Sequence, residues 1–149
     1  MSEVKVKKRK IAWGITGAGD KIAEIIETMK EFKKQSDDVV DIDVYVSKNA
    51  ETMLKFYRLD EELKKSFPKV YIEANSNSPF LAGMMESGKY EFLLIMPSSS
   101  NTVAKIVNSI SDTLLTNSAL MALKAFVPVW VMPVDFKEGV VTTRLPNGK

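Results

Sequence analysis

Tyr90–Met96 (YEFLLIM) is followed directly by Pro97–Thr102 (PSSSNT), and these two adjacent segments give the clearest indication of the fold. The first segment is a short, almost continuous apolar run, typical of a strand buried on both faces of a parallel sheet. The second is a row of proline, serine, asparagine and threonine, the residue types that end a strand and begin a helix. The sequence therefore predicts a buried strand, a polar turn and the start of a helix.

Segments on both sides of this stretch repeat the alternation of apolar runs with helical patterns. Apolar residues recur at three- and four-residue spacing in Asp20–Lys34, which predicts a helix there. Four further strands are predicted at Lys10–Thr16, Val40–Ser47, Val70–Ile72 and Val129–Val134. Further helices are predicted at about 49–57, 80–86 and 112–125, and another directly after Pro97. Residues 59–67 are predicted to be a helix or a loop. Strands and helices at this spacing form parallel βαβ units. The predicted fold class is α/β, a doubly wound parallel sheet with helices on both faces.

Length and composition are those of one ordinary globular domain. The chain has 149 residues, of which 45% are hydrophobic and 27% charged, enough to bury a core without disulfides or metals. Residues 1–10 are predicted to be a solvated basic tail and residues 11–149 a single domain. The tail could instead contact nucleic acid or anionic lipid, but a net charge of +2 argues against nucleic acid as the main partner. The apolar run Ile11–Ile15 is shorter than a signal peptide or a membrane span requires, so we expect a cytoplasmic protein without membrane contact.

Two absent residue types limit the chemistry. The chain has no cysteine, which excludes a thiolate nucleophile, an Fe–S cluster and a thiolate zinc site. It has no histidine, the usual general base near neutral pH and the commonest ligand of transition metals. Redox or group-transfer chemistry would therefore have to come from a bound cofactor.

Two polar turns follow the first two predicted strands. In Gly17-Ala18-Gly19-Asp20 the glycines let a ligand approach the backbone, and the next helix offers N–H groups to an anion. The spacing is not that of a dinucleotide fingerprint, and the segment is equally a tight turn in which Asp20 caps the helix. Ser47-Lys48-Asn49 offers a hydroxyl, a cation and an amide, which suit the phosphate of FMN or the 2′-phosphate of NADP. Ser47 could also be only the cap of the following helix.

The third polar turn, Pro97–Thr102, carries the strongest indication of a ligand. A helix cap needs one hydroxyl or amide, whereas five consecutive small polar residues stand at this helix start. The additional donors could bind the polar edge of a flavin and its ribityl chain. The alternative is a helix start with spare serines.

This third turn and the sequence after it resemble the flavoprotein superfamily. Pro97–Thr102, then Ala104–Ile106 and Asp112–Thr116, are similar to the segment that begins Pro-Ala-Ser-Ala-Asn-Thr in that superfamily. Its members include phosphopantothenoylcysteine decarboxylase, lantibiotic cysteine decarboxylases and flavin prenyltransferases. The resemblance extends over about residues 11–135, and the two earlier turns match the family's FMN-phosphate turns. It implies a Rossmann-like, flavodoxin-related fold and FMN as cofactor.

The resemblance also implies which residues hold FMN and how the chain assembles. The candidate cofactor-binding residues are Gly17, Ala18, Gly19, Ser47, Asn49, Pro97, Ser98, Ser99, Ser100, Asn101 and Thr102. Asn75, Asn77 and Asp135 are site candidates only by analogy of position, and no catalytic residue is assigned. The family forms trimers or multiples of trimers with FMN at subunit interfaces. The apolar side chains of Leu114–Leu123 suit such a homo-oligomer interface, or equally an ordinary buried helix.

Two departures from the family narrow the predicted role. The decarboxylases use a histidine, which this chain lacks, and Met132–Asp135 stands where they have Pro-x-Met-Asn. Decarboxylation is therefore disfavoured. The chain is most similar to the archaeal flavoproteins, which exchange electrons with ferredoxin, and to dihydromethanopterin reductases. The resemblance thus implies an FMN oxidoreductase or electron carrier, with a redox partner such as ferredoxin. One alternative is a flavin prenyltransferase-like enzyme, which ranks lower because the sequence shows no clear cationic cluster for a second phosphate beyond Lys48 and Lys124. The other is a non-enzymatic flavin- or NADP-binding module.

Overall fold

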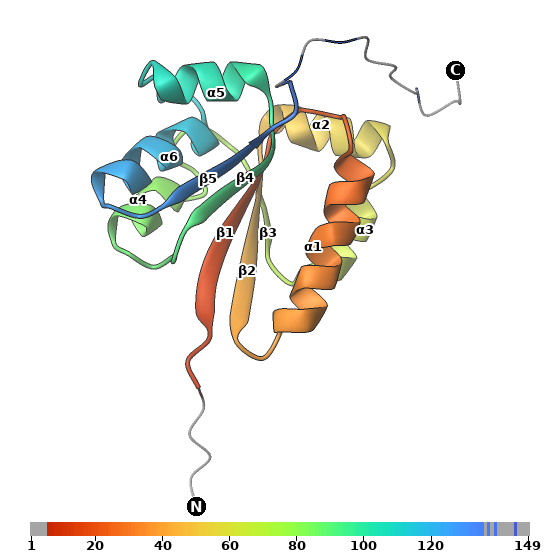
Figure 1. The fold of residues 1–149 in the computed structure, drawn as a ribbon, viewed down its shortest axis with the longest axis horizontal. Helices are drawn as coiled ribbons and strands as arrows, with labels where there is room; N and C mark the ends of the chain where they lie inside the picture. The colour runs from red at the N-terminus through yellow and green to blue at the C-terminus, as the bar shows by residue number, and fades with distance from the viewer. Residues whose placement is uncertain (1–5, 136, 138, 140–144, 146–149) are drawn as a thin grey trace, which may run out of the picture.

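The computed structural model describes residues 6–135, 137, 139 and 145, which form a parallel sheet between two layers of helices (Figure 1). The five strands are β1 (Arg9–Ile15), β2 (Val40–Val46), β3 (Val70–Ile72), β4 (Leu93–Ser98) and β5 (Val129–Pro133). Their order in the sheet is β3-β2-β1-β4-β5, and every neighbouring pair is parallel. This is the strand order of a Rossmann-type sheet. The predicted α/β fold class is confirmed.

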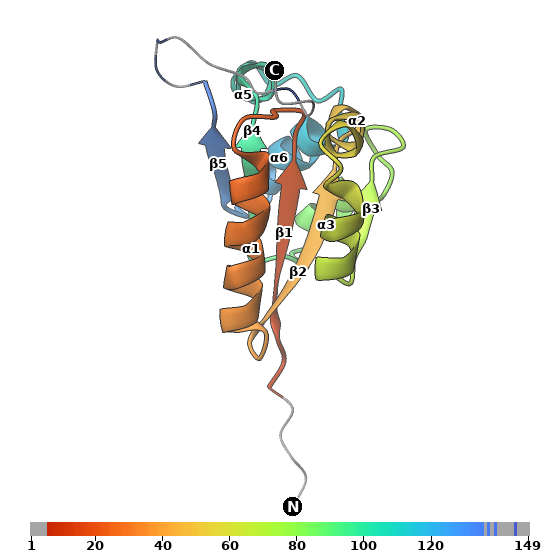
Figure 2. The ribbon, with the colours of Figure 1, turned by 90° about the vertical axis from the view of Figure 1, so that its right-hand side faces the viewer.

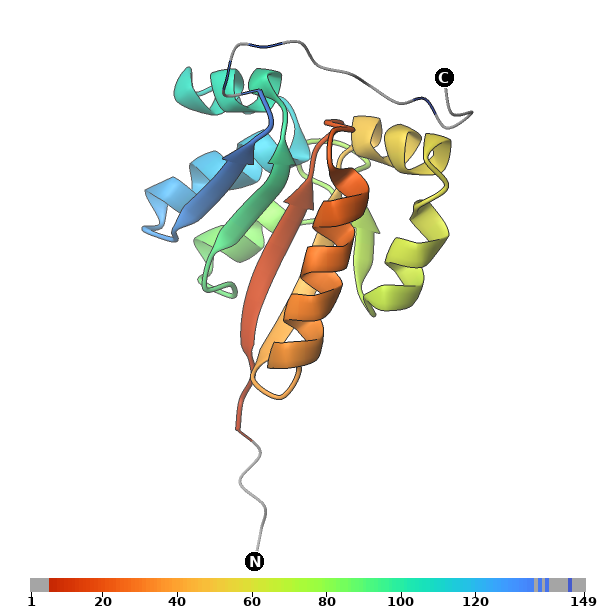
Figure 3. The same ribbon diagram turned by 45° about the vertical axis from the view of Figure 1, so that its right-hand side comes forward.

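Helices cover both faces of the sheet, as Figure 3 shows. One layer consists of α1 (Ile22–Ser36), α2 (Lys48–Phe56) and α3 (Asp60–Ser66). The other consists of α4 (Leu81–Glu86), α5 (Ser100–Val107) and α6 (Leu114–Lys124). No helix in the described part of the chain has the length and apolar character needed to cross a membrane.

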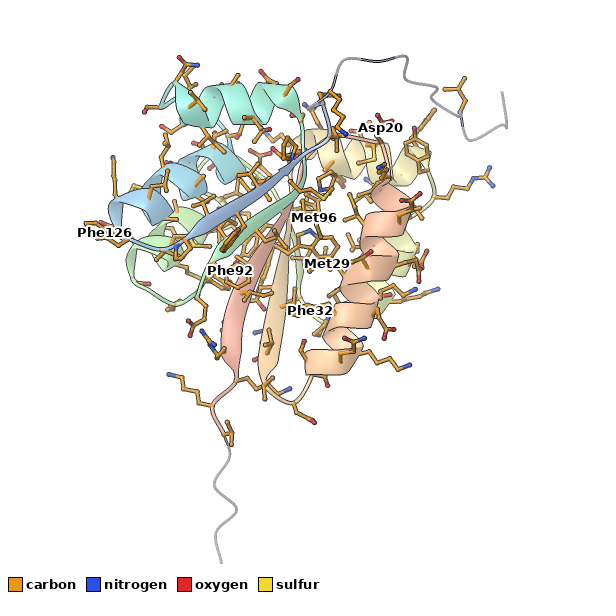
Figure 4. The ribbon with its side chains drawn as sticks, viewed as in Figure 1. Asp20, Met29, Phe32, Phe92, Met96 and Phe126 are labelled. Atoms are coloured by element: carbon orange, nitrogen blue, oxygen red, sulfur yellow. The ribbon has the colours of Figure 1, made fainter. Side chains whose placement is uncertain are left out.

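The first layer packs on a core centred on β1. Trp13 has no exposed surface, its Nε1–H donates to the Met96 carbonyl (2.6 Å), and its ring meets Phe67 edge-on at 5.3 Å. Figure 4 shows Met29 of α1 pointing toward the sheet and Met96 of β4 pointing toward α1. The alternating side chains of β1 thus fill the space under α1, as the period of a strand requires.

The second layer packs on a core that contains a buried polar network. The Tyr45 and Tyr90 hydroxyls lie 2.7 Å apart, and the Tyr90 hydroxyl donates to Asp43 Oδ2 (2.8 Å). The Tyr45 ring stacks on Tyr71 at 5.0 Å. Burial raises the pKa of Tyr45 to about 12, and burial together with the hydrogen bond to Tyr45 also raises the pKa of Tyr90. Both phenols are therefore neutral at physiological pH.

Several element boundaries differ from the sequence predictions. β4 begins at Leu93 rather than Tyr90, because Tyr90 turns into the core to reach Asp43. The strand then runs on through Pro97 to Ser98, where the Ser98 carbonyl accepts from the Val134 N–H (3.1 Å). The last residues of the predicted basic tail belong to the fold, since β1 begins at Arg9, whose guanidinium donates to Glu91 (2.8 Å).

α1 begins later than predicted, and α5 has no buried residue. Asp20 does not cap α1: the helix begins at Ile22, preceded by Lys21 in the left-handed region (φ 61°) and without a side-chain cap. α5 ends at Val107, and none of its eight described residues is buried. Its amphipathic pattern therefore leaves apolar side chains such as Val107, which is 76% exposed, in contact with solvent.

Large apolar side chains are also exposed at the β5 edge of the molecule. Trp130 in β5 is 63% exposed, and Leu123 near the end of α6 is 52% exposed. Phe126, in the turn between α6 and β5, is 96% exposed and projects away from the molecule in Figure 4. Only this C-terminal end of α6 is open, since Leu114 and Leu115 at its start are buried in the core. Leu123, the large apolar side chain that α6 leaves exposed, thus lies in its last turn.

Candidate ligand-binding site

The candidate site lies at the carboxyl ends of the strands, where β1 and β4 adjoin and the strand order reverses (Figure 2). Thr16 links the turns that follow these two strands. Its hydroxyl donates to the Pro97 carbonyl (2.8 Å) and accepts from the Ser99 N–H (3.0 Å). The Ser47 N–H donates to the Ile15 carbonyl (3.0 Å), which adds the turn after β2. The three polar turns singled out from the sequence therefore lie side by side.

A polar cavity of about 730 Å³ opens between these turns and the start of α6. That volume is within the range of small-molecule sites. Its wall consists of Thr16, Gly17, Ser47, Lys48, Asn49, Glu73, Asn75, Ser76, Ser99, Asn101, Thr102, Lys105, Asp112, Thr113 and Leu115. We call this the turn cavity.

A second hollow of about 540 Å³ adjoins the turn cavity and has a more aromatic wall. The two share Gly17, Asn49 and Ser99. The second hollow, the α2 hollow, is lined in addition by Ala18, Gly19, Asp20, Thr52, Met53, Phe56, Tyr57, Val134 and Asp135. A ligand longer than one hollow could therefore extend across the shared residues into the other.

The two glycines of the first turn permit close approach of other elements. A Cβ on Gly17 would lie 2.8 Å from the Cβ of Asn49, so only glycine lets this turn sit against the start of α2. A Cβ on Gly19 would lie 3.2 Å from the ring of Tyr57. Tyr57 in turn meets Phe56 edge-on at 5.3 Å, which forms the aromatic wall of the α2 hollow.

Ser47 and Ser99 act as helix caps and also line the turn cavity. The Ser47 hydroxyl accepts from the Ala50 N–H (3.0 Å) at the start of α2. The Ser99 hydroxyl accepts from the Thr102 N–H (3.3 Å) at the start of α5 and lies 3.1 Å from the Thr102 hydroxyl. Each of these serines can therefore cap its helix and contact a ligand in the cavity at the same time.

Three of the predicted site residues do not reach either hollow. Pro97 and Ser98 are buried within β4 and do not line the turn cavity: the Pro97 carbonyl accepts from Thr16, and Ser98 pairs with Pro133 of β5. Ser100 is the first residue of α5 and is exposed. Of this turn, Ser99, Asn101 and Thr102 line the turn cavity, whereas Ser100 does not.

Several cavity residues were not predicted from the sequence. Among them are Glu73, which follows β3, Lys105 within α5, and Asp112 and Thr113, which precede α6. Only the positions after a strand and before a helix carry a local signal that could have indicated them. Of the residues left open, Asn75 and Asp135 line the hollows, whereas Asn77 does not. Lys124 lies in the last turn of α6 and contributes to neither hollow.

Charged groups of both signs face the turn cavity. Lys105 Nζ contacts both carboxylate oxygens of Asp112, at 3.0 and 2.9 Å. Glu73, 9% exposed, accepts from the backbone N–H groups of Lys48 (2.9 Å) and Leu114 (2.7 Å). Among the described residues, no group of three or more acidic side chains is placed to hold a metal ion. The arrangement suits an organic ligand that carries both an anionic group and hydrogen-bonding edges.

Comparison with protein families and curated proteins gives consistent matches. The family model named Flavoprotein matches residues 1–136. An uncharacterized protein of Methanocaldococcus jannaschii, MJ0730, is 48% identical over 94% of this chain and 74% of its own length. Dihydromethanopterin reductase (acceptor) is 39% identical in M. jannaschii and 37% identical in Methanosarcina mazei. These two matches cover 92% and 93% of this chain but only 58% and 59% of the reductases.

Solved structures give the same picture of the fold. The crystal structure of Burkholderia xenovorans DmrB in complex with FMN, described as a cubic protein cage for redox transfer, superposes with a TM-score of 0.77. It is 35% identical, and the match covers 91% of this chain and 71% of DmrB. AnUbiX (PadA1), crystallised with FMN and dimethylallyl pyrophosphate, has a TM-score of 0.68, and the match covers 89% of this chain and 69% of that chain. At 20% identity, AnUbiX supports the fold alone.

Proposed function

We propose a function for this chain from one premise: the chain belongs to the flavoprotein family. It binds FMN at the three polar turns and serves as a flavin-dependent reductase or electron carrier of the dihydromethanopterin-reductase kind. The observation that carries this proposal is the meeting of the three turns at one polar cavity beside the point where the strand order reverses. The identity of 37–39% to dihydromethanopterin reductases supports the redox role.

The residues of the cavity fit FMN chemically. The hydroxyls of Ser47, Ser99 and Thr102 and the cation of Lys48 are groups that bind a phosphate or a ribityl chain. Gly17, which has no side chain, lets the first turn pack against Asn49 at the start of α2, and both residues line the cavity. FMN would supply hydride or single-electron transfer when bound. The chain's own contribution is to orient the cofactor between α2, α5 and α6.

The activity of the full-length reductases is a proposal for this chain, because the chain matches only 58–59% of their length. A reductase function is favoured over prenyl transfer, because the described residues that line the two hollows offer no unpaired cation besides Lys48 for a second phosphate. Lys124, one of two cations considered for a second phosphate, is not at the site. Lys105, which is at the site, is paired with Asp112. A non-enzymatic flavin- or NADP-binding module rests on the same phosphate-binding turns.

An absorbance spectrum of the purified protein, with mass spectrometry of the released ligand, tests the proposal. The expected result is the visible absorption of oxidised flavin, bleached by dithionite, and the mass of FMN. A colourless protein that gains no flavin absorption when incubated with FMN would contradict it. Titration with FMN, riboflavin and NADP separates the alternatives: preference for NADP favours the non-enzymatic module. A five-carbon adduct on FMN after incubation with dimethylallyl phosphate favours prenyl transfer.

A substitution at Gly17 links FMN binding to the turns. In Gly17→Ala the new methyl group collides with Asn49, so the first turn must move away from α2. FMN affinity is expected to fall about tenfold or more, because a shift of this size removes hydrogen-bond geometry worth more than 1 kcal/mol. Gly139→Ala, whose Cβ would meet nothing within 4 Å, is the matched control and should bind FMN like wild type. Equal FMN affinities of the two variants would show that the first turn is not part of the FMN site.

The proposal extends to assembly as a homo-oligomer. Trp130, Phe126 and Val107 are exposed apolar side chains of a kind that self-association buries. DmrB, at 35% identity, forms a cubic cage. A trimer or a multiple of trimers is the expected stoichiometry, and a redox partner such as ferredoxin is the expected electron donor or acceptor. Sedimentation velocity tests the first, and reduction of the bound flavin by reduced ferredoxin tests the second.

A further inference from the structure

Glu73 lies between the starts of α2 and α6, and the proposed FMN binding assigns it no role. It is the residue after β3, and its backbone N–H still donates to the Val46 carbonyl of β2 (2.9 Å). The backbone of Glu73 is therefore fixed by the sheet. Its side chain is 9% exposed and lies in the wall of the turn cavity.

The carboxylate of Glu73 spans the first residues of α2 and α6. One oxygen accepts from the N–H of Lys48, the first residue of α2 (2.9 Å). The other accepts from the N–H of Leu114, the first residue of α6 (2.7 Å). A helix start carries unpaired N–H groups and partial positive charge, so a carboxylate at this place is stabilised by both helices.

The ordinary capping of the two helices is already provided by other side chains. Ser47 caps α2 by accepting from the Ala50 N–H, and Thr113 caps α6 by accepting from the Thr116 N–H (3.3 Å). Glu73 is thus additional to the caps, and what it adds is a link between the two helices. The link matters for the site because Lys48 and Thr113, at the starts of the two helices, both line the turn cavity.

We propose that Glu73 is a positioning residue that holds the starts of α2 and α6 at a fixed separation and so preforms the turn cavity for its ligand. This inference rests on the proposed FMN function for the identity of the ligand. The mechanical part does not, because the two N–H contacts exist in the protein by itself. Loss of the link lets the α6 wall move relative to the α2 wall.

Asn117 supplies a matched control for this proposal. Its side-chain amide donates to the Ser76 carbonyl (2.9 Å) and to Asn77 Oδ1 (3.2 Å), so it also ties the loop after β3 to α6. Asn117 lines neither hollow and does not reach α2. Asn117→Ala therefore loosens the same loop and helix without removing the link between the two helix starts.

The experiment compares wild type, Glu73→Gln and Asn117→Ala in two measurements. The first is amide hydrogen exchange at Lys48 and Leu114 in the protein without flavin, read by NMR. A glutamine side chain can accept at only one of the two N–H groups, so exchange in Glu73→Gln is expected to rise about tenfold or more at the other. The second is FMN affinity with the visible spectrum of bound flavin. Affinity is expected to fall about tenfold and the band to shift in Glu73→Gln, with both unchanged in Asn117→Ala.

The outcomes separate the two proposals. Wild-type protein that binds no FMN contradicts the proposed function, while the exchange measurement still decides the positioning role. Glu73→Gln protein with wild-type exchange, affinity and spectrum overturns the positioning role. So does an equal loss of affinity in Asn117→Ala, because that result assigns the effect to general loosening of α6. Glu73→Asp, which keeps the charge but is one methylene too short to span both helices, replaces Glu73→Gln if that variant does not fold, and the same exchange and affinity criteria then apply.

Discussion

The two tryptophans of the chain mark two contrasting regions of one sheet. Trp13 lies on the central strand β1, without exposed surface, with its indole N–H bonded to the Met96 carbonyl and its ring against Phe67. Trp130 lies on the edge strand β5 and is 63% exposed. The centre of the sheet is therefore complete within one chain, whereas the β5 edge presents apolar surface that a monomer does not bury.

The largest expected effect is at the centre of the sheet. Trp13→Ala removes a fully buried aromatic side chain and the hydrogen bond to Met96, and should lower the free energy of unfolding by about 3–5 kcal/mol. Urea denaturation followed by circular dichroism measures this loss. A decrease below about 1 kcal/mol would mean that the centre of the sheet is no better packed than its edge.

A smaller decrease in the free energy of unfolding is expected at high pH. It comes from Tyr45 on β2, which is buried on the face of the sheet opposite Trp13. Burial raises the pKa of Tyr45 to about 12, compared with 10.0 for an ordinary tyrosine. The unfolded chain therefore loses this proton first, so the stabilisation is complete below pH 10 and is lost as the pH rises to about 12. Two pKa units correspond to about 2–3 kcal/mol.

The variant that tests this pH dependence is Tyr45→Phe, which keeps the ring that stacks on Tyr71. Its unfolding free energy should fall less steeply than that of wild type between pH 10 and 12. Chemical denaturation at intervals across this range measures both slopes. Parallel slopes for the two proteins would show that Tyr45 ionises equally in the folded and unfolded chain.

The smallest effect on folding, combined with a clear effect on assembly, is expected at the β5 edge. Trp130→Glu replaces an exposed side chain, so the free energy of unfolding of the monomer should change by no more than about 0.5 kcal/mol. The same change puts a charge into the proposed subunit interface and should shift sedimentation toward smaller species. Val39→Glu, at an exposed apolar residue in the turn before β2, is the control and should leave assembly unchanged. Identical sedimentation of the Trp130→Glu variant and wild type would place the interface elsewhere.

Elements that a single local pattern determines have the structure predicted from the sequence. β3 has the predicted bounds, Val70–Ile72, because a short β-branched run between polar segments has few alternatives. The predicted start of β4 is wrong because a tertiary contact sets this boundary. The Tyr90 hydroxyl donates to Asp43 of β2, and the strand begins only at Leu93. No local pattern contains that information.

The candidate site was predictable only in its turn residues. Gly17, Ser47 and Ser99 were found because glycine turns and helix starts carry local signals. Glu73 and Lys105 were missed because a single charged residue after a strand or within a helix has no distinctive pattern. Pro97 and Ser98 were included because the start of a polar run does not reveal where the strand before it ends.

The double hydrogen bond of Thr16 has a consequence for exchanging loops between related proteins. Its hydroxyl donates to the Pro97 carbonyl near the end of β4 and accepts from the Ser99 N–H just after that strand, so the first and third turns are joined through Thr16. Transplanting the third turn alone into another scaffold would leave its Ser99 N–H and its Pro97 carbonyl without their partner. The smallest transferable unit for engineering is therefore the pair of turns with Thr16 between them.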